Sequence, residues 1–171
     1  QGGVYTNSIN NIFNAVVLSP TYYDWKGKFT YIHGEFDTQR KIDIAKLEST
    51  FNVEIGSDQE ELFKLIYSLE TYYSIILRII AHKAVFGNCS CDRSIFDDSA
   101  YVAKGITNYS SVNYYNWFLT VPEVESLVSE VYNAIILEEI ETEGDTISEI
   151  FEHIFPKEIR HCVGEYYTPY W

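Results

Sequence analysis

The chain has 171 residues, 46% of them hydrophobic and 22% charged, which is the composition of a globular protein with one core. Its 25 acidic and 12 basic residues give a formal net charge of −13, and the acidic stretch at residues 121–152 would repel a nucleic acid rather than hold it. The most apolar run, 75–81, contains an arginine and is far shorter than the roughly 20 residues that cross a bilayer, so we expect no membrane contact.

The N-terminal third of the chain predicts short elements. Residues 7–17 have the apolar spacing of a helix. A loose alternation of aromatic residues near two glycines allows a short β-hairpin near residues 28–36, or an irregular loop. Residues 37–51 again have helical spacing, and residues 1–56 as a whole are interpreted as an N-terminal extension of uncertain packing. One side of the first helix would carry Ile9, Ile12, Phe13 and Val16.

The clearest predicted helix follows Gly56 and ends near Phe86, where a Gly-Asn pair stops it. Ser57 and Glu60 have the spacing of a capping box, in which each side chain satisfies a free backbone N–H of the first turn. A helix this apolar packs on more than one side, so we interpret it as the centre of a helical domain, residues 57–163. Its main apolar stripe, at alternating spacings of four and three, is Leu62, Ile66, Leu69, Tyr73, Ile76 and Ile80.

The second half of the chain continues with shorter helices. Residues 88–111 form a polar connector with a short helix around 94–104, and the apolar residues 112–119 form either the start of a helix or a buried segment. Pro122 suits the first turn of the next helix, where its missing N–H has no cost, and that helix is predicted to reach about residue 140.

Two more helices complete the prediction. Thr146 and Glu149 have the spacing of a second capping box. Pro156 ends the helix that they open and can begin a short helix that finishes near Gly164. The predicted fold class is therefore mainly α, an irregular helical bundle.

Acidic residues are concentrated in one part of the chain. Residues 121–152 contain ten carboxylates and no lysine or arginine. Such a run is ordinarily the solvated face of one or more helices. The alternative is a docking surface for a basic partner.

The cysteines and histidines give little indication of a metal or catalytic site. Three cysteines without a signal peptide favour a reducing cytoplasm. Cys89 and Cys91, with His82 nearby, raise the alternative of a small zinc site, but the spacing differs from a Cys-x2-Cys pair and no second ligand pair follows. We therefore predict no metal ligands. No histidine lies in a nucleophile pattern and no glycine-rich phosphate loop occurs, so no catalytic residue is predicted.

The last residues of the chain have the features of a ligand-facing loop. Gly164 allows a sharp turn after the preceding helix. Pro169 forces Thr168 into extended geometry, which turns its hydroxyl outward, and the rings of Tyr166 and Tyr167 offer flat surfaces for stacking. The chain ends on an aromatic residue two positions later and contains no methionine, so we expect it to be a fragment of a longer protein.

These residues resemble a known family. The Gly-Glu-Tyr-Tyr-Thr-Pro element and its approach from residue 145 are similar to those of bacterial DNA adenine methyltransferases that modify the exocyclic amine, including the large restriction–modification type. Those enzymes carry Gly-x-Tyr/Phe-Tyr-Thr-Pro just before the methyltransferase core. Weaker likenesses at 69–81, 105–109 and 115–119 extend the resemblance over roughly residues 60–171.

The resemblance implies a cofactor site at the C-terminal element. Residues 164–171 would be the start of a truncated methyltransferase domain, in which Tyr167, Thr168 and Pro169 contact the amino-acid end of S-adenosylmethionine and Tyr166 supports them. The family's glycine-rich turn and its Asn/Asp-Pro-Pro-Tyr/Phe motif, whose aromatic ring stacks on a flipped adenine, are absent from these residues. The fragment alone is therefore expected to be inactive.

The sequence thus predicts the helical N-terminal segment of a methyltransferase of the bacterial cytoplasm, with or without a fused restriction nuclease. Its partners would be its own methyltransferase core and, through the missing part of the protein, DNA. The alternative is a non-enzymatic acidic helical protein-interaction module.

Overall fold

The computed structural model describes residues 2–33, 42–88, 93–107, 109, 114–135 and 146–162. Across these ranges the chain forms α-helices and short 3-10 helices, and no strand occurs among them. The predicted class, a mainly α irregular helical bundle, is confirmed. The elements in chain order are α1 (Gly2–Ala15), η1 (Val16–Leu18), α2 (Tyr22–His33), α3 (Ile44–Phe51), α4 (Gln59–Phe86), η2 (Arg93–Phe96), α5 (Asp98–Ala103), η3 (Asn116–Thr120), α6 (Pro122–Ala134), α7 (Thr146–Ile154) and α8 (Lys157–Cys162).

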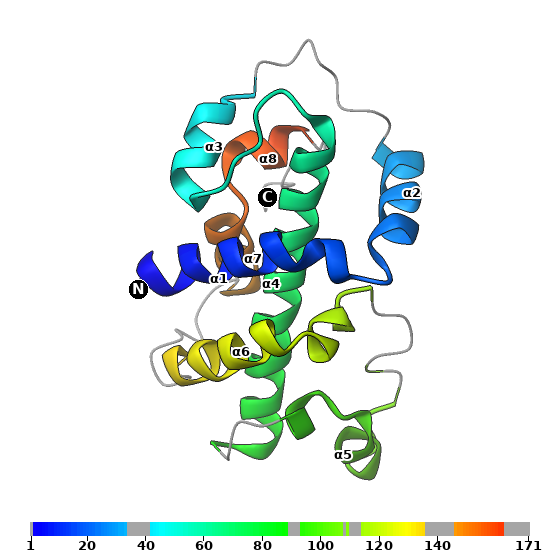
Figure 1. Cartoon of the computed structure of the whole chain (residues 1–171). Helices are drawn as coiled ribbons and strands as arrows, with labels where there is room; N and C mark the ends of the chain where they lie inside the picture. Colours follow the sequence, from blue (N-terminus) through cyan, green and yellow to red (C-terminus); the bar gives the residue numbers. More distant parts are fainter. Residues whose placement is uncertain are drawn as a thin grey trace, which may run out of the picture.

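The 28-residue helix α4 runs through the length of the molecule, and the other helices are arranged around it (Figure 1). Helices α1 and α6 lie side by side across α4, and both contact it. In the predicted apolar stripe, Leu62, Ile66 and Leu69 are buried. Leu65, Ile75 and Ile79, which lie outside that stripe, have no exposed surface, so α4 packs on more than one side. The prediction of a central helix is confirmed.

Helix α4 begins and ends at local signals. Asp58, not the predicted Ser57, is the N-cap, and its carboxylate accepts a hydrogen bond of 2.8 Å from the backbone N–H of Glu60. The cap is one residue later than predicted because Gly56 turns the chain with a φ of 59° before Asp58 adopts extended geometry. At the other end Gly87, with a φ of 75°, stops the helix as predicted.

Residues 28–33 belong to α2, so the hairpin considered near residues 28–36 is wrong for that part; residues 34–36 lie outside the described residues. Tyr22, Trp25 and Phe29 are spaced three and four apart and are all buried, which is the pattern of a helix packed on one side. Gly27 is exposed on the opposite side, where its low helix propensity is outweighed by this packing.

Tyr67 of α4 forms hydrogen bonds that hold the residues just before α2 against the core. The hydroxyl of Tyr67 donates to the carbonyl oxygen of Tyr114 at 2.7 Å, and it lies 3.0 Å from Ser19 Oγ and 2.8 Å from Thr21 Oγ1. Buried residues of α1, α2 and α3 share one core with α4, whereas the packing of residues 1–56 is uncertain from the sequence alone. The proposed division into domains stays a prediction.

Two other predicted helix boundaries are wrong. Helix α3 begins at Ile44 instead of near residue 37, because the Asp43 carboxylate caps it by accepting from Lys46 N at 3.0 Å. Helix α6 begins at Pro122 as predicted but ends at Ala134, before the expected residue 140, because Ile135 adopts extended geometry. Residues 37–41 and 136–145 lie outside the described residues.

Candidate functional site

Helix α7 lies on α4 and separates two grooves. Phe151 of α7 and Phe155, the residue that follows α7, make edge-on contacts with the ring of Tyr73, with centroid distances of 5.7 and 5.8 Å. Both grooves use α4 as their floor, and Ile80 contributes to both. Helix α7 therefore forms one wall of each groove.

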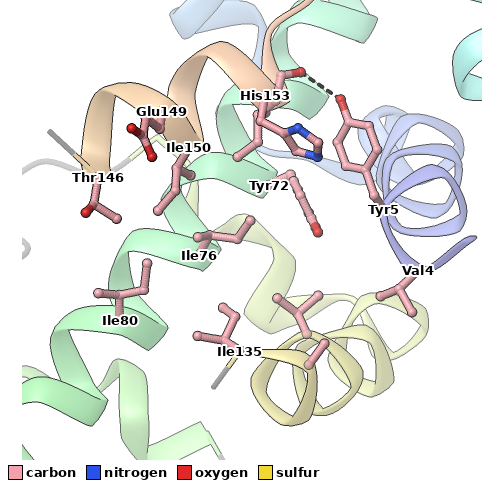
Figure 2. A pocket seen from close by; sticks show the side chains of 13 residues that line it. Val4, Tyr5, Tyr72, Ile76, Ile80, Ile135, Thr146, Glu149, Ile150 and His153 are labelled. Carbon is pink, nitrogen blue, oxygen red and sulfur yellow. Dashed lines mark hydrogen bonds between the residues drawn. The ribbon is translucent and has the colours of Figure 1, made fainter. Parts of the chain in front are cut away.

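The first, which we call the isoleucine groove, lies between α1, α6 and α7 and has a volume of about 750 Å³. Figure 2 shows Ile76, Ile80 and Ile135 around the space, with Glu149 toward one end and His153 toward the other. Its apolar lining further includes Val4, Val131, Ala134, Ile150 and Ile154. It suits an apolar surface or a hydrocarbon group better than a charged ligand.

The two tyrosines of the isoleucine groove are poorly suited to acid–base chemistry. The hydroxyl of Tyr5 donates a 2.7 Å hydrogen bond to the carbonyl oxygen of Ile154, and burial raises the pKa of Tyr5. Burial also raises the pKa of Tyr72 to about 12. Both phenols therefore stay protonated near neutral pH.

The second, the arginine groove, follows the other side of α7 and has a volume of about 720 Å³. Its two charged lining residues, Glu70 and Arg78, are eight positions apart on α4 and so about 12 Å apart along the helix axis. Glu70 is partnered, because its Oε2 accepts from Trp25 Nε1 at 2.7 Å and from the Tyr115 hydroxyl at 2.6 Å. Burial, followed by the Glu70 carboxylate, raises the pKa of Tyr115.

Arg78 is the unusual group in this groove. Its side chain is buried, with the residue only 5% exposed, yet neither Nη1 nor Nη2 has a hydrogen-bond partner in the part of the chain that the structure describes. The guanidinium carbon lies 5.3 Å from the centre of the Tyr109 ring, a cation–π contact. Burial lowers the pKa of Arg78, and the attraction of Tyr109 and Asp98 opposes that shift.

Two tyrosines stand beside Arg78. The rings of Tyr101 and Tyr109 stack with centroids 4.0 Å apart, and both hydroxyls are buried with no hydrogen-bond partner outside this pair among the described residues. Burial, and next the neighbouring Tyr109 hydroxyl, raise the pKa of Tyr101. The cluster therefore holds a fixed positive charge and two phenol groups that can donate.

The residues predicted to hold the cofactor, Tyr166, Tyr167, Thr168 and Pro169, lie outside the described residues, as do Cys89 and Cys91. His82, the third residue of the zinc alternative, is buried, with its ring 4.9 Å from that of Phe86. The described residues contain no group of three or more histidine, cysteine or acidic side chains placed to hold a metal ion.

The structure does describe the helix that leads to the predicted cofactor element. Ile159 of α8 is fully buried, and Arg160 Nε donates to the carbonyl oxygen of Phe155 at 3.0 Å. Glu158 pairs with Lys46 of α3 at 2.5 Å. Helix α8 is thus attached to the core just before residue 163.

Arg78 was missed as a candidate because the sequence shows it only as an interruption of an apolar run. The available signal was the charge itself, since an arginine between Leu77 and Ile79 in a helix packed on several sides must be partly buried. Its neighbours Tyr101 and Tyr109 lie in the connector at residues 88–111, far from Arg78 in the sequence, so no local pattern predicts that they meet it.

Among the described helices, none combines the length and hydrophobicity that a membrane crossing requires. No protein-family model, curated protein or solved structure matches the chain.

Proposed function

We propose that this chain is the helical N-terminal segment of a bacterial, cytoplasmic DNA adenine methyltransferase that uses S-adenosylmethionine. The observation that carries the proposal is the Gly-Glu-Tyr-Tyr-Thr-Pro element at residues 164–169 and the similarity of its approach to that family. The segment would pack on the methyltransferase core, which binds DNA, and would present Tyr167, Thr168 and Pro169 to the cofactor, with Tyr166 in support.

The helical bundle supports the second half of this role, the presentation of the element. Helix α8 is held by the buried Ile159 and by the contact of Lys46 with Glu158, so the element that follows it starts from a fixed point. A fixed start lowers the entropy lost when a loop closes on a ligand. S-adenosylmethionine would supply the methyl group in the complete enzyme.

The proposal is tested first on the gene and then on its full-length product. The reading frame should continue past Trp171 into a glycine-rich turn and an Asn/Asp-Pro-Pro-Tyr/Phe motif. The full-length protein should transfer tritiated methyl groups from S-adenosylmethionine to DNA. Absence of both motifs, or of any transfer to mixed-sequence DNA, would contradict the proposal.

A substitution in the element tests its cofactor role. Thr168→Ala should raise the KM for S-adenosylmethionine about tenfold, because a hydrogen bond to a charged group is lost. Thr30→Ala is the matched control, since Thr30 Oγ1 donates within α2, to the carbonyl oxygen of Lys26. Equal KM values in the two variants would remove the element from the cofactor site.

A second candidate function is a non-enzymatic acidic helical module that binds a basic protein. It is favoured by the run of ten carboxylates in residues 121–152, of which Glu130, Glu149 and Glu152 are exposed. It predicts that the gene stops near residue 171 and that an identified basic protein co-purifies from native cells. The association should be lost when these three residues are changed to Gln and should persist in Glu54→Gln.

A further inference from the structure

We propose that the arginine groove binds a small organic monocarboxylate, whose carboxylate pairs with Arg78 while its apolar body lies along α4. This inference does not depend on the methyltransferase proposal, because it concerns a site formed within the described helices.

The first step is the state of Arg78. An arginine stays charged in a folded protein, so burying Arg78 leaves a cation without hydrogen bonds at Nη1 and Nη2, and the attraction of Asp98 offsets only part of the cost of burial. The Tyr109 ring offsets part of that cost, but a ring face cannot accept the in-plane N–H bonds of a guanidinium. Two parallel N–H groups without acceptors match the two oxygens of a carboxylate.

The second step is the surrounding chemistry. The Tyr109 ring lies against the guanidinium and lines the groove, and Tyr101 stacks on that ring. Neither hydroxyl has a hydrogen-bond partner outside this pair among the described residues. The pKa of Tyr101 is raised, mainly by burial, so this phenol is a hydrogen-bond donor at neutral pH. A ligand oxygen at Arg78 would therefore find further donors close by.

The third step is the shape of the groove. Its α4 residues run from Glu70 to Ala81, which is roughly 16 Å of helix, and Leu77, Phe151 and Phe155 give it an apolar lining. A cavity of about 720 Å³ with a mostly apolar wall and a few converging polar groups is typical of sites for small ligands.

The fourth step is the charge of the ligand. Glu70 already accepts from Trp25 and Tyr115, so the charge in the groove without hydrogen-bond partners is a single cation. Asp98 attracts Arg78, and the chain as a whole carries a net charge of −13, so a second negative charge on the ligand would be repelled. The site therefore favours a monoanionic carboxylate over a phosphate dianion.

The test is an NMR titration of the ¹⁵N-labelled 171-residue chain with 4-phenylbutyrate, its neutral analogue 4-phenylbutyramide, and phenyl phosphate. We expect saturable binding of 4-phenylbutyrate with shifts at residues of the arginine groove. The amide and the phosphate should each bind at least about tenfold more weakly, because hydrogen bonds between charged groups are lost or a second charge is repelled.

Three variants assign the binding to Arg78. Arg78→Met should weaken 4-phenylbutyrate binding by about tenfold or more, whereas Lys104→Met, which removes the same charge from an exposed position on the neighbouring connector, should not change it. Arg78→Lys keeps the charge without the planar fork and should also weaken binding. If Arg78→Met does not fold, the affinities of Arg78→Lys and Tyr109→Phe for 4-phenylbutyrate are measured instead, and both should be lower than that of the wild type.

The inference is overturned by any of four results. These are no saturable binding of 4-phenylbutyrate, equal binding of the amide, equal or tighter binding of phenyl phosphate, and unchanged affinity in the folded Arg78 variants. A failure of methyl transfer by the full-length protein would leave these results unaffected, so the two proposals fail separately.

Discussion

Lys83 and Arg78 are both cations buried on α4, five positions apart, but their surroundings differ. Lys83 Nζ donates to the carbonyl oxygens of Tyr132 and Ile135 and lies 4.1 Å from the centre of the Tyr132 ring. Arg78 has the equivalent ring contact but no hydrogen bond at Nη1 or Nη2 within the described part of the chain.

The difference shows how one helix can use buried charge in two ways. Lys83 donates hydrogen bonds to carbonyl groups at the C-terminal end of α6. Such carbonyl groups lack a partner inside the helix and carry the partial negative charge of the helix dipole. The role of Lys83 is structural and complete. The arginine has no hydrogen bond at Nη1 or Nη2 among the described residues, which is the arrangement expected if it binds the carboxylate proposed above.

Replacing Lys83 should give the largest effect. Lys83→Met removes two charge-assisted hydrogen bonds and leaves the carbonyls of Tyr132 and Ile135 without this donor, so the free energy of unfolding should fall by about 3 kcal/mol. Urea unfolding followed by circular dichroism measures it. Lys104→Met is the control, and a loss as small as that of the control would show that Lys83 does not hold α6.

The next largest effect is expected at the partnered end of the arginine groove. Glu70→Ala removes the acceptor of Trp25 Nε1 and of the Tyr115 hydroxyl, and we expect a loss of about 2 kcal/mol in the free energy of unfolding. Glu70→Gln keeps an oxygen acceptor and should lose less than about 1 kcal/mol. Tryptophan fluorescence during urea unfolding gives both values. Similar losses in the two variants would argue against these hydrogen bonds as the cause.

Arg78 should behave in the opposite way to Lys83. Arg78→Met removes a buried charge that lacks hydrogen bonds and replaces it with an apolar chain of similar length, so stability should be unchanged or should rise by about 1 kcal/mol. The measurement is the same urea unfolding, without added carboxylate. A loss above about 1 kcal/mol would mean that Arg78 is already satisfied in the folded chain, as Lys83 is.

Local signals explain which parts of the fold could be predicted from the sequence. Helix α4 can be predicted because its signals are local. Apolar residues recur every three or four positions along it, and Gly87 directly follows its last turn. The partners of Lys83 and Arg78 could not be found this way, since Lys83 and Tyr132 are 49 positions apart. Near residues 28–36 a loose alternation of aromatic residues is compatible with a hairpin, but the buried residues Tyr22, Trp25 and Phe29 have helical spacing, and the packing of that face determines the structure.

The two candidate sites differ in the same respect. The C-terminal element was recognised because its residues are contiguous, and its role as a cofactor site stays a prediction. The arginine groove combines residues from α4, α7 and the connector at Tyr109, so no contiguous pattern marks it. Sequence spacing identifies sites within one loop, whereas sites assembled from several helices require the packing.

The smallest effect extends the comparison to a charge at the surface. Glu48 Oε1 accepts from the backbone N–H groups of Ile55 and Gly56, both at 2.8 Å, and the Gly56 bond is the main reason that the pKa of Glu48 lies below its ordinary value of 4.5. A lowered carboxyl pKa adds stability that is present above pH 4.5 and is lost as the pH falls through the lowered pKa. Glu48→Gln should therefore be less stable than the wild type near neutral pH, and the gap in urea midpoint should close in acid. Glu54→Gln, the same charge change in the loop between α3 and α4, is the control variant. A gap for Glu48→Gln that stays constant with pH would rule out titration of Glu48 as its source.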